Sequence, residues 1–258
     1  LTGKARSFGG SLIRPEATGF GAVYYLESVM KHEHDTLAGK TVAVAGFGNV
    51  AWGVVQKLTE LGAKPVTLSG PDGYIYDPDG ITTKEKFDFM LEMRASGRNK
   101  VQDYADKFGC KFVAGDKPWG EKVDIIMPCA TQNDVDLTQA KRIVANNIKY
   151  YIEVANMPTT NEALRFLMDQ KNMVVAPSKA VNAGGVLVSA LEMSQNSERL
   201  SWTSEEVDAK LHQIMIQIHD GSAECAEKYG LGYNLVAGAN MVGFQKVADA
   251  MMAQGICW

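Results

Sequence analysis

The sequence predicts an α/β fold: a doubly wound, mainly parallel sheet with helices on both faces, followed by helices at the C-terminal end. Two observations support this prediction. Short apolar runs alternate with segments of helical periodicity through about residue 200, and only helical periodicity follows. We therefore expect one domain over residues 1–200 and a helical segment over residues 201–258, which packs back on that domain or toward a domain outside this chain.

A glycine-rich turn, Gly46-Phe-Gly-Asn-Val-Ala51, lies near the start of this alternation. It follows the apolar run Val42–Ala45 and opens a helix that continues to Leu61, and a second strand is expected at Lys64–Ser69. The turn matches the G-x-G-x-x-G/A pattern of Rossmann-like dinucleotide-binding units. A glycine-rich turn without a ligand can show the same pattern, but the strand–turn–helix–strand context favours a dinucleotide.

Each position of this turn has a physical reason in a dinucleotide-binding unit. Gly46 permits the tight turn, and Gly48 lets the backbone approach a pyrophosphate. The helix that follows offers free N–H groups and a partial positive charge at Asn49 and Val50, which favour phosphate. Ala51 is small enough for the helix to pack closely on the strand. We therefore expect a pyrophosphate to bind where this helix begins.

The composition narrows the class of partner. The chain has 258 residues, with 26 basic and 30 acidic side chains and a net charge of −4. This mildly acidic balance argues against nucleic acid or an anionic membrane as the main partner. No apolar stretch reaches the roughly 20 residues that cross a bilayer, and the N-terminus lacks a signal-peptide pattern. We expect neither nucleic acid nor membrane among the partners.

The cysteines and histidines give no metal-binding pattern. The four cysteines are scattered, without a CxxC pair or a Cys/His cluster, at Cys110, Cys129, Cys225 and Cys257. Scattered thiols are typical of a reduced, cytoplasmic protein. The four histidines lack acidic or cysteine partners at ligand spacing. We therefore expect a cytoplasmic protein without a bound metal.

The other elements follow from apolar periodicity and from helix start signals. Strands are expected at residues 111–113, 123–127, 150–154 and 173–176, and a turn-rich loop at residues 67–80. Helices are expected at residues 101–108, 137–145 and 186–195 and again after Gly238. Capping boxes are expected to start helices at Thr82, Thr159 and Thr203.

A first helix is expected just after Arg14-Pro15, because proline suits the first helical position. This helix contains Gly19 and Gly21, which weaken helices and indicate the close approach of another backbone or of a ligand. Ligands of parallel sheets bind at the carboxyl ends of the strands. The expected loops that lie there contain Asn49, Ser69, Ala130, Asn156 and Ser178.

Five motifs together resemble the hexameric bacterial-type glutamate dehydrogenases. They are the glycine-rich turn and the segments 9–19, 128–133, 155–160 and 178–185. They occur in the family's order, and the likeness covers essentially the whole chain. Enzymes of this family carry an N-terminal substrate domain with the catalytic lysines and the proton-handling aspartate, and Leu1–Ser11 is similar to an interior loop. The resemblance therefore implies a fragment with no catalytic residue of its own.

The resemblance also assigns contacts to the cofactor. Thr18 corresponds to the threonine at the nicotinamide end, and Asn49 to the asparagine beside the phosphates. Asn156 corresponds to the asparagine near the nicotinamide ribose. Ala130 and Thr131 correspond to the loop over the adenosine ribose.

The substrate contacts implied by the resemblance lie on the helix expected at residues 186–195. Ser189 resembles the serine that binds the γ-carboxylate of glutamate, and Val186, one helical turn earlier, lines the same pocket. A serine hydroxyl can donate to a carboxylate, whereas branched-chain amino-acid dehydrogenases need apolar contacts there. A serine on an apolar helix can also be structural. The resemblance favours the substrate role.

The choice of cofactor is predicted from the end of the second strand. An NAD site usually places an acid there to hold the ribose hydroxyls, but this strand ends in Leu68-Ser69-Gly70, and Asp72 lies beyond the turn. Ser69 would tolerate a 2′-phosphate. Candidate cations for that phosphate follow in the basic segment, at Arg94, Arg98 and Lys100. A solvated basic loop is the alternative, but the sequence favours NADP over NAD.

The residues and the resemblance together predict the cofactor domain of an NADP-dependent glutamate dehydrogenase. The intact enzyme would convert L-glutamate reversibly into 2-oxoglutarate and ammonium, as a homo-hexamer. This chain alone would bind cofactor without turnover and would be a monomer or a weak dimer. Two alternatives stay open: another amino-acid dehydrogenase of the leucine or phenylalanine type, and a dinucleotide-sensing module without catalysis.

Overall fold

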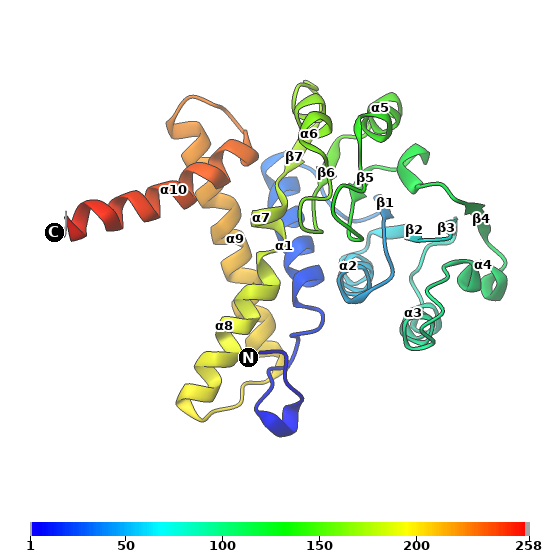
Figure 1. Ribbon diagram of the computed structural model, residues 1–258, viewed down its shortest axis with the longest axis horizontal. Helices are drawn as coiled ribbons and strands as arrows, with labels where there is room; N and C mark the ends of the chain where they lie inside the picture. Colours follow the sequence, from blue (N-terminus) through cyan, green and yellow to red (C-terminus); the bar gives the residue numbers. More distant parts are fainter. Residues whose placement is uncertain (1, 256–258) are drawn as a thin grey trace.

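Seven strands form one sheet at the centre of the structure, a computed structural model that describes residues 2–255 (Figure 1). Their order in the sheet is β4-β3-β2-β1-β5-β6-β7. The strands are β1 (Thr41–Val44), β2 (Lys64–Gly70), β3 (Gly73–Tyr76), β4 (Lys111–Ala114), β5 (Ile125–Met127), β6 (Tyr150–Ile152) and β7 (Val174–Ala176). Strands β2, β1, β5, β6 and β7 are parallel, and β3 is antiparallel to β2 and β4. The predicted mainly parallel, Rossmann-like sheet is confirmed.

Helices cover both faces of this sheet. The α-helices are α1 (Ala17–His32), α2 (Asn49–Glu60), α3 (Lys84–Ala95), α4 (Gln102–Phe108), α5 (Leu137–Ala145), α6 (Asn161–Met168), α7 (Ser178–Val181), α8 (Ala183–Glu198), α9 (Ser204–Lys228) and α10 (Leu235–Gln254); two 3-10 turns, η1 (Arg6–Phe8) and η2 (Pro118–Gly120), accompany them. Helices α2, α3 and α4 lie on one face, and α5 and α6 lie on the other (Figure 1).

The side chains of β1 show how the two faces are divided. Val42 and Val44 join the apolar cluster that includes α1 and α2, whereas Ala43 and Ala45 join the cluster that includes α5 and α6. Alternate residues of a strand point to opposite faces, so a strand buried on both faces must be apolar throughout. The short apolar run that begins the alternation is thus a central strand.

The chain reverses its direction of growth across the sheet at β1. From β1 it proceeds outward through β2, β3 and β4, and it then returns to β5 on the other side of β1 and continues to β7. In open α/β sheets the carboxyl ends of the two strands at such a reversal form the ligand-binding crevice. The glycine-rich turn follows β1 and therefore lies at this point.

The region predicted as a loop at residues 67–80 instead contains a β-hairpin. Strands β2 and β3 pair from Thr67 with Tyr76 to Gly70 with Gly73, so that only two residues make the turn. Gly73 has a φ of 145°, and a side chain there would overlap the carbonyl oxygen of Val113 on β4. Only glycine fits both requirements. The prediction was wrong because the glycines that permit the hairpin resemble ordinary loop punctuation.

Helix starts differ from the predictions by one residue in two places. Thr203 and Glu206 form the predicted capping box of α9. In α3 and α6 the caps are Thr83 and Thr160, each the second threonine of its pair. Both hydroxyls accept from the backbone N–H three residues on, and no capping box forms at the first threonine.

The last helix, α10, begins at Leu235 rather than after Gly238. Asn234 caps it by accepting from the Ala237 N–H at 3.0 Å. Gly238 lies inside the helix, where a side chain would overlap the Ser222 carbonyl of α9. This glycine is therefore present for helix–helix contact, which explains why it does not mark a helix boundary.

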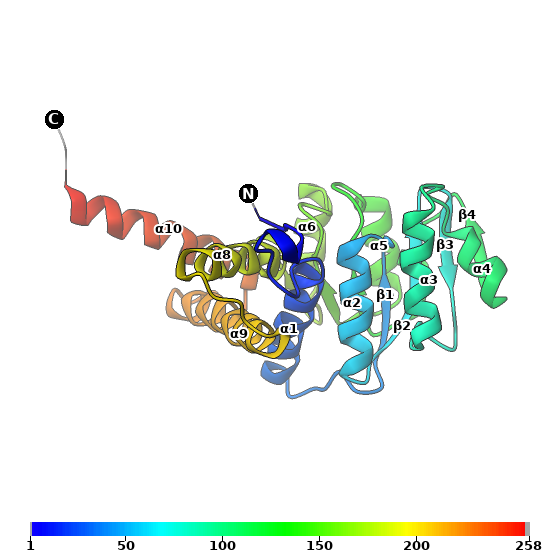
Figure 2. The same ribbon diagram turned by 90° about the horizontal axis from the view of Figure 1, so that it is seen from below.

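The C-terminal helices divide into a packed part and an extended part. Helix α9 packs against α1 and α8, and α10 packs on α9 and reaches β7 near its start. Beyond this contact α10 extends away from the body toward the C-terminus (Figures 1 and 2). Its exposed apolar side chains are Phe244, Val247, Met251 and Met252.

Within residues 2–255, the structure contains no helix that is long and apolar enough to cross a membrane. Cys110, Cys129 and Cys225 are free thiols. Burial raises the pKa of Cys110 to about 11, so this thiol stays protonated at neutral pH. Cys257 lies outside the described residues.

Helix α1 meets two other helices backbone to backbone, as its glycines predicted. A Cβ added to Gly19 would lie 2.6 Å from the Val50 carbonyl oxygen and 2.7 Å from the Gly53 carbonyl carbon, both in α2. A Cβ on Gly21 would lie 2.9 Å from Gly184 Cα in α8. Separations below 3.0 Å require the backbone to move, so α1 holds both helices at their closest approach.

We expect Gly19→Ala to lower the free energy of unfolding by about 2–3 kcal/mol, because the new methyl group overpacks a contact between two backbones. Gly221→Ala in α9 is the matched control, since nothing lies within 4 Å of its added Cβ. An alanine in an open helical position stabilises by about 0.5–1 kcal/mol. Urea denaturation of the two variants measures both effects, and equal stabilities would contradict the contact.

Candidate functional site

The glycine-rich turn lies between the carboxyl ends of β1 and β5. Gly46 has a φ of 85°, and its N–H donates to Ser69 Oγ at 2.9 Å. A Cβ on Gly46 would lie 3.2 Å from Ala130 Cα, which follows β5. Glycine is required here both by the left-handed backbone and by the neighbouring loop. The structure thus brings the first turn glycine, Ser69 and Ala130 together.

The start of α2 is open to a ligand. Gly48 is the N-cap of α2 and carries no capping side chain, so the first N–H groups of the helix lack a side-chain acceptor. Nothing lies within 4 Å of the position a Gly48 Cβ would take. Uncapped N–H groups and the positive end of the helix dipole suit a pyrophosphate. The exposed Asn49 and the half-buried Val50 form the first turn of the helix.

The structure places the three basic residues predicted near the ribose in three different environments. Arg94 lies in the last turn of α3 and donates a hydrogen bond to Asn49 Oδ1 at the start of α2. Arg98 forms an ion pair with Asp103 at 2.5 Å. Lys100 is exposed in the loop before α4. The three cations therefore do not converge on one point.

The end of β2 presents a carboxylate rather than a free serine. Ser69 is 1% exposed, and its hydroxyl accepts from Gly46, so its predicted contact with a cofactor stays a prediction. Asp72 accepts from the N–H groups of Val101 and Gln102, both at 3.0 Å, and so caps α4. A Cβ on Gly70 would lie 2.8 Å from Asp72 Oδ1. A fixed carboxylate thus stands beside the end of the strand.

A second group of predicted residues meets at the start of α8. Asn182, the N-cap of α8, donates from Nδ2 to Asn156 Oδ1 at 2.8 Å. A Cβ on Gly185 would overlap Thr18 Oγ1 of α1. Asn156 and Thr18, which the resemblance assigned to the nicotinamide end, are thus connected through the first turn of α8. Thr131 is exposed in the loop after β5.

Ser189 has a hydrogen-bond environment that the sequence did not reveal. Its Oγ accepts from Thr2 Oγ1 at 2.9 Å and from Arg14 Nε at 2.8 Å. A serine hydroxyl has two acceptor lone pairs and one donor proton. Both lone pairs are used, so the hydroxyl proton is left for an outside acceptor. Val186, one turn earlier, is 71% exposed and thus accessible as a pocket wall.

Arg14 is a candidate site residue that the sequence did not single out. It belongs to a motif that carried the resemblance. Nothing in the linear sequence shows, however, that its side chain contacts Ser189, which lies 175 positions further along the chain. Only its Nε is used in that contact, and the structure gives its two terminal nitrogens no acceptor among residues 2–255. A free guanidinium edge beside a hydroxyl proton is suited to bind a carboxylate.

A buried carboxyl supports the edge of the site. Glu153, which follows β6, is 3% exposed and accepts from the Ser178 N–H at 3.0 Å. Burial raises the pKa of Glu153, and hydrogen bonds from Thr159 and Ser178 oppose the rise. This contact fixes the start of α7, between β7 and α8.

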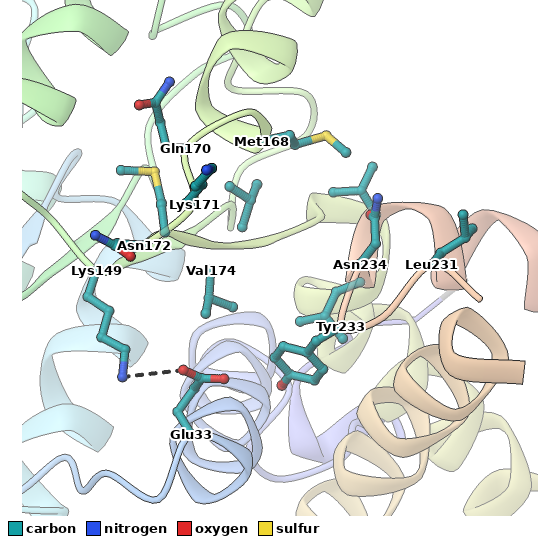
Figure 3. Close-up of a pocket in the computed structure, with 14 residues that line it drawn as sticks. Glu33, Lys149, Met168, Gln170, Lys171, Asn172, Val174, Leu231, Tyr233 and Asn234 are labelled. Carbon is teal, nitrogen blue, oxygen red and sulfur yellow. Dashed lines mark ion pairs between the residues drawn. The ribbon is translucent and has the colours of Figure 1, made fainter. Parts of the chain in front are cut away.

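Two cavities in the structure lie away from these residues. One, of about 710 Å³, opens at the amino ends of β6 and β7, between Lys149, Val174 and the α9–α10 loop at Tyr233 (Figure 3). Lys149 forms an ion pair with Glu33 across it at 3.3 Å. A second cavity, of about 870 Å³, lies between α1 and α9. Neither is at the carboxyl end of the sheet.

No group of three or more potential metal ligands occurs in the described part of the chain. The groups at this edge of the sheet are backbone N–H groups, side-chain amides and the Arg14–Ser189 pair. The glycine-rich turn opens α2, and the Arg14–Ser189 hydrogen bond connects the segment before α1 to α8.

Comparison with known proteins agrees with this geometry. Residues 9–255 match the family model described as Glutamate/Leucine/Phenylalanine/Valine dehydrogenase. The chain belongs to this family. Two relatives are an NAD-specific glutamate dehydrogenase of Clostridium symbiosum, 84% identical over 258 residues, and an NADP-specific glutamate dehydrogenase of Haemophilus influenzae, 50% identical over 261 residues.

The match covers all of this chain but only part of each relative. It spans 100% of the chain and 57% of the Clostridium symbiosum protein, and 99% of the chain and 57% of the Haemophilus influenzae protein. A solved glutamate dehydrogenase that is 84% identical superposes with a TM-score of 0.99, again over 100% of this chain and 57% of that one. The chain thus spans a little over half the length of the relatives that it matches.

We expect Ser69→Ala to destabilise the glycine-rich turn, because the buried Gly46 N–H loses its acceptor. An unsatisfied buried donor costs about 1–3 kcal/mol, and dinucleotide affinity falls with the loosened turn. The matched control is Ser194→Ala, an exposed serine of α8 whose hydroxyl donates only within its own helix. Urea denaturation and NADH titration of both variants measure these effects. A Ser69 variant as stable as the control would show that the turn does not depend on this hydrogen bond.

Proposed function

We propose that this chain is the cofactor-binding part of a glutamate dehydrogenase. The whole enzyme oxidatively deaminates L-glutamate to 2-oxoglutarate and ammonium, and the reaction is reversible. The observation that carries this proposal is the Arg14–Ser189 pair, whose serine lies on α8, because α1 packs α8 against α2, the helix that the glycine-rich turn opens. Family membership and the names of the relatives support it.

The Arg14–Ser189 pair supports glutamate over an apolar amino acid. A carboxylate that approaches Ser189 meets one free hydroxyl proton and the unpaired edge of a guanidinium, which together satisfy both of its oxygens. An apolar side chain would leave these donors unpaired and desolvated, at a cost of about 1–3 kcal/mol per group. Leucine and phenylalanine are therefore poor substrates for this site, which argues against the other dehydrogenases of the family.

The roles of the cofactor residues follow from their positions. The N–H groups at the start of α2 hold the pyrophosphate, with Gly48 giving access and Asn49 held by Arg94. Asn156 and Thr18 orient the nicotinamide end toward α8. The nicotinamide, when bound, accepts the hydride from the α-carbon of glutamate. Ala130 and Thr131 form the loop at the adenosine end.

We favour NAD as the cofactor, although the sequence predicted NADP. Relatives of both kinds match, so the comparisons leave the choice open. The carboxylate of Asp72 stands beside the end of β2, where a 2′-phosphate would bring negative charge. Of the predicted cations, Arg98 is paired and Arg94 contacts Asn49. The relative that is 84% identical is named NAD-specific, which supports the same choice.

The catalytic groups are proposed to lie in a substrate domain outside this chain. We also propose that residues 1–200 form the dinucleotide-binding domain and that residues 201–258 form a helical segment, whose last helix is α10. We propose that the exposed stripe of Phe244, Val247 and Met251 contacts that domain. Assembly as a homo-hexamer and a cytoplasmic location are parts of the same proposal. A dinucleotide-sensing module without catalysis would need no carboxylate-binding pair.

We expect the isolated chain to bind NADH but to show no glutamate-dependent reduction of NAD, because the groups that take the protons of the reaction are proposed to lie in the substrate domain outside this chain. Isothermal titration measures the binding, and absorbance of the reduced nicotinamide measures turnover. The same protein joined to its upstream segment should be active. Turnover by the chain alone would place the catalytic groups here, and the absence of NADH binding would contradict the cofactor assignment.

We expect the chain to bind NADH more tightly than NADPH. Asp72→Asn should lower the ratio of the two dissociation constants about fivefold, because removing a partly exposed charge changes the binding free energy by about 1 kcal/mol. Asp79→Asn, an exposed acid in the loop after the hairpin, is the matched control. Titrations with both reduced cofactors at one salt concentration give the ratio of the dissociation constants. Tighter binding of NADPH by the unchanged chain would restore the NADP prediction.

A further inference from the structure

One carboxylate on α8 holds both ends of the N-terminal loop. Glu192 is completely buried, and its Oε2 accepts from the N–H groups of Gly3 at 3.1 Å and Ser11 at 3.2 Å. Its Oε1 accepts from Lys4 Nζ at 2.6 Å. A buried charge is tolerated only when it is paired and hydrogen-bonded, and this one is both. Figure 2 shows the loop lying beside α8.

Two further residues of the same helix face bind the middle and end of this loop. Gln195 donates from Nε2 to Ser11 Oγ at 2.9 Å, and Asn196 donates from Nδ2 to the Gly9 carbonyl at 2.7 Å. With Glu192 they occupy positions three and four residues apart, which share one face of a helix. The loop is therefore attached to α8 at three successive points.

The charge state of Glu192 is fixed by these contacts. Burial alone would raise the pKa of its carboxyl group, but the hydrogen bonds from Lys4 and from the backbone of Ser11 and Gly3 lower it to about 2. The carboxylate is thus ionised wherever the protein is folded at ordinary pH. Lys4 balances its charge, so Glu192 does not repel an anion bound one helical turn away.

The loop that Glu192 holds delivers both partners of Ser189. Thr2 directly precedes Gly3, and Arg14 follows Ser11 by three residues. These two side chains donate the hydrogen bonds that use the lone pairs of Ser189 Oγ and so direct its proton outward. Ser189 itself lies on α8 three residues before Glu192, on the same face. One helix thus carries both the receptor for the carboxylate and the anchor of the loop that completes it.

We infer that Glu192 is a positioning residue for the substrate-carboxylate subsite: it holds the loop between Thr2 and Arg14 so that both side chains reach Ser189. The inference rests on the proposed function, because it gives Glu192 a role in binding the carboxylate of glutamate. Glu192 does not touch the substrate and acts through Arg14, Thr2 and Ser189.

The test is a double-mutant cycle in the full-length enzyme, with Glu192→Gln, Ser189→Ala and both together. Glu192→Gln keeps the shape of the side chain and removes its charge. We expect it to raise the KM for glutamate about tenfold, within the range of coupling between residues of one network, while kcat and the KM for NAD change little. In the Ser189→Ala background the same change should raise the KM for glutamate by less than about twofold.

Glu198→Gln is the matched control, since Glu198 is an exposed acid at the end of the same helix, and it should leave every constant unchanged. Lys4→Gln is the second variant. It leaves Glu192 its backbone donors at Gly3, Lys4 and Ser11, so we expect a smaller rise in the KM for glutamate, which should also disappear in the Ser189→Ala background. If the Glu192→Gln enzyme does not fold, the cycle built on Lys4→Gln decides.

The outcomes separate the two ideas. Effects of Glu192→Gln and Ser189→Ala that simply multiply, or an equal rise in the KM values for glutamate and NAD, overturn the positioning role and leave the proposed function standing. If the full-length protein without any substitution does not reduce NAD when glutamate is added, both the proposed function and this inference are overturned.

Discussion

The structure depends on the contact of α1 with two other helices through bare backbone. Gly19 lies against Gly53 and Val50 of α2, and Gly21 lies against Gly184 of α8, at separations that leave no room for a Cβ atom. One helix therefore joins the unit that contains the glycine-rich turn to the helix that contains Ser189. Backbone contacts of this kind leave little freedom to slide, because close-packed interiors transmit displacement instead of absorbing it. The relative placement of the two halves of the site is set here.

The sequence predicted the fold well wherever periodicity was strong. Helix α5 was predicted at its observed bounds, and the strands of the parallel part were found within two residues. Where the signal was local chemistry, it was ambiguous. Two adjacent threonines offered two possible caps, and the one that fits depends on which N–H groups the helix leaves free. Gly73 and Gly238 looked like breaks, but their lack of a side chain serves contacts with Val113 and Ser222, which are distant in the chain.

In the candidate site, too, features encoded in consecutive residues could be predicted, whereas features that depend on contacts between distant residues could not. The glycine-rich turn could be predicted because its chemistry is encoded in consecutive residues from Gly46 to Ala51. The orientation of Ser189 could not, because it depends on Arg14 and Thr2, which precede it by more than 170 positions. The role of Ser69 was ambiguous for a related reason. A small polar residue at a strand end can face a ligand or support the turn, and only the burial of its hydroxyl beside the Gly46 N–H indicates the second.

In the proposed enzyme, the backbone contacts of α1 fix the distance between the cofactor site and the substrate site. The dinucleotide is held where α2 begins, the carboxylate is held at Ser189, and α1 fixes the distance between α2 and α8. Loop residues could adapt to a shorter substrate, but Thr2 and Arg14 belong to a segment that Glu192 ties to α8 itself. A substrate one methylene shorter than glutamate would thus leave either its carboxylate short of Arg14 or its α-carbon short of the nicotinamide. Misplacement by about 1 Å can reduce the rate about 100-fold, so selectivity for chain length follows from helix contacts that never touch the substrate.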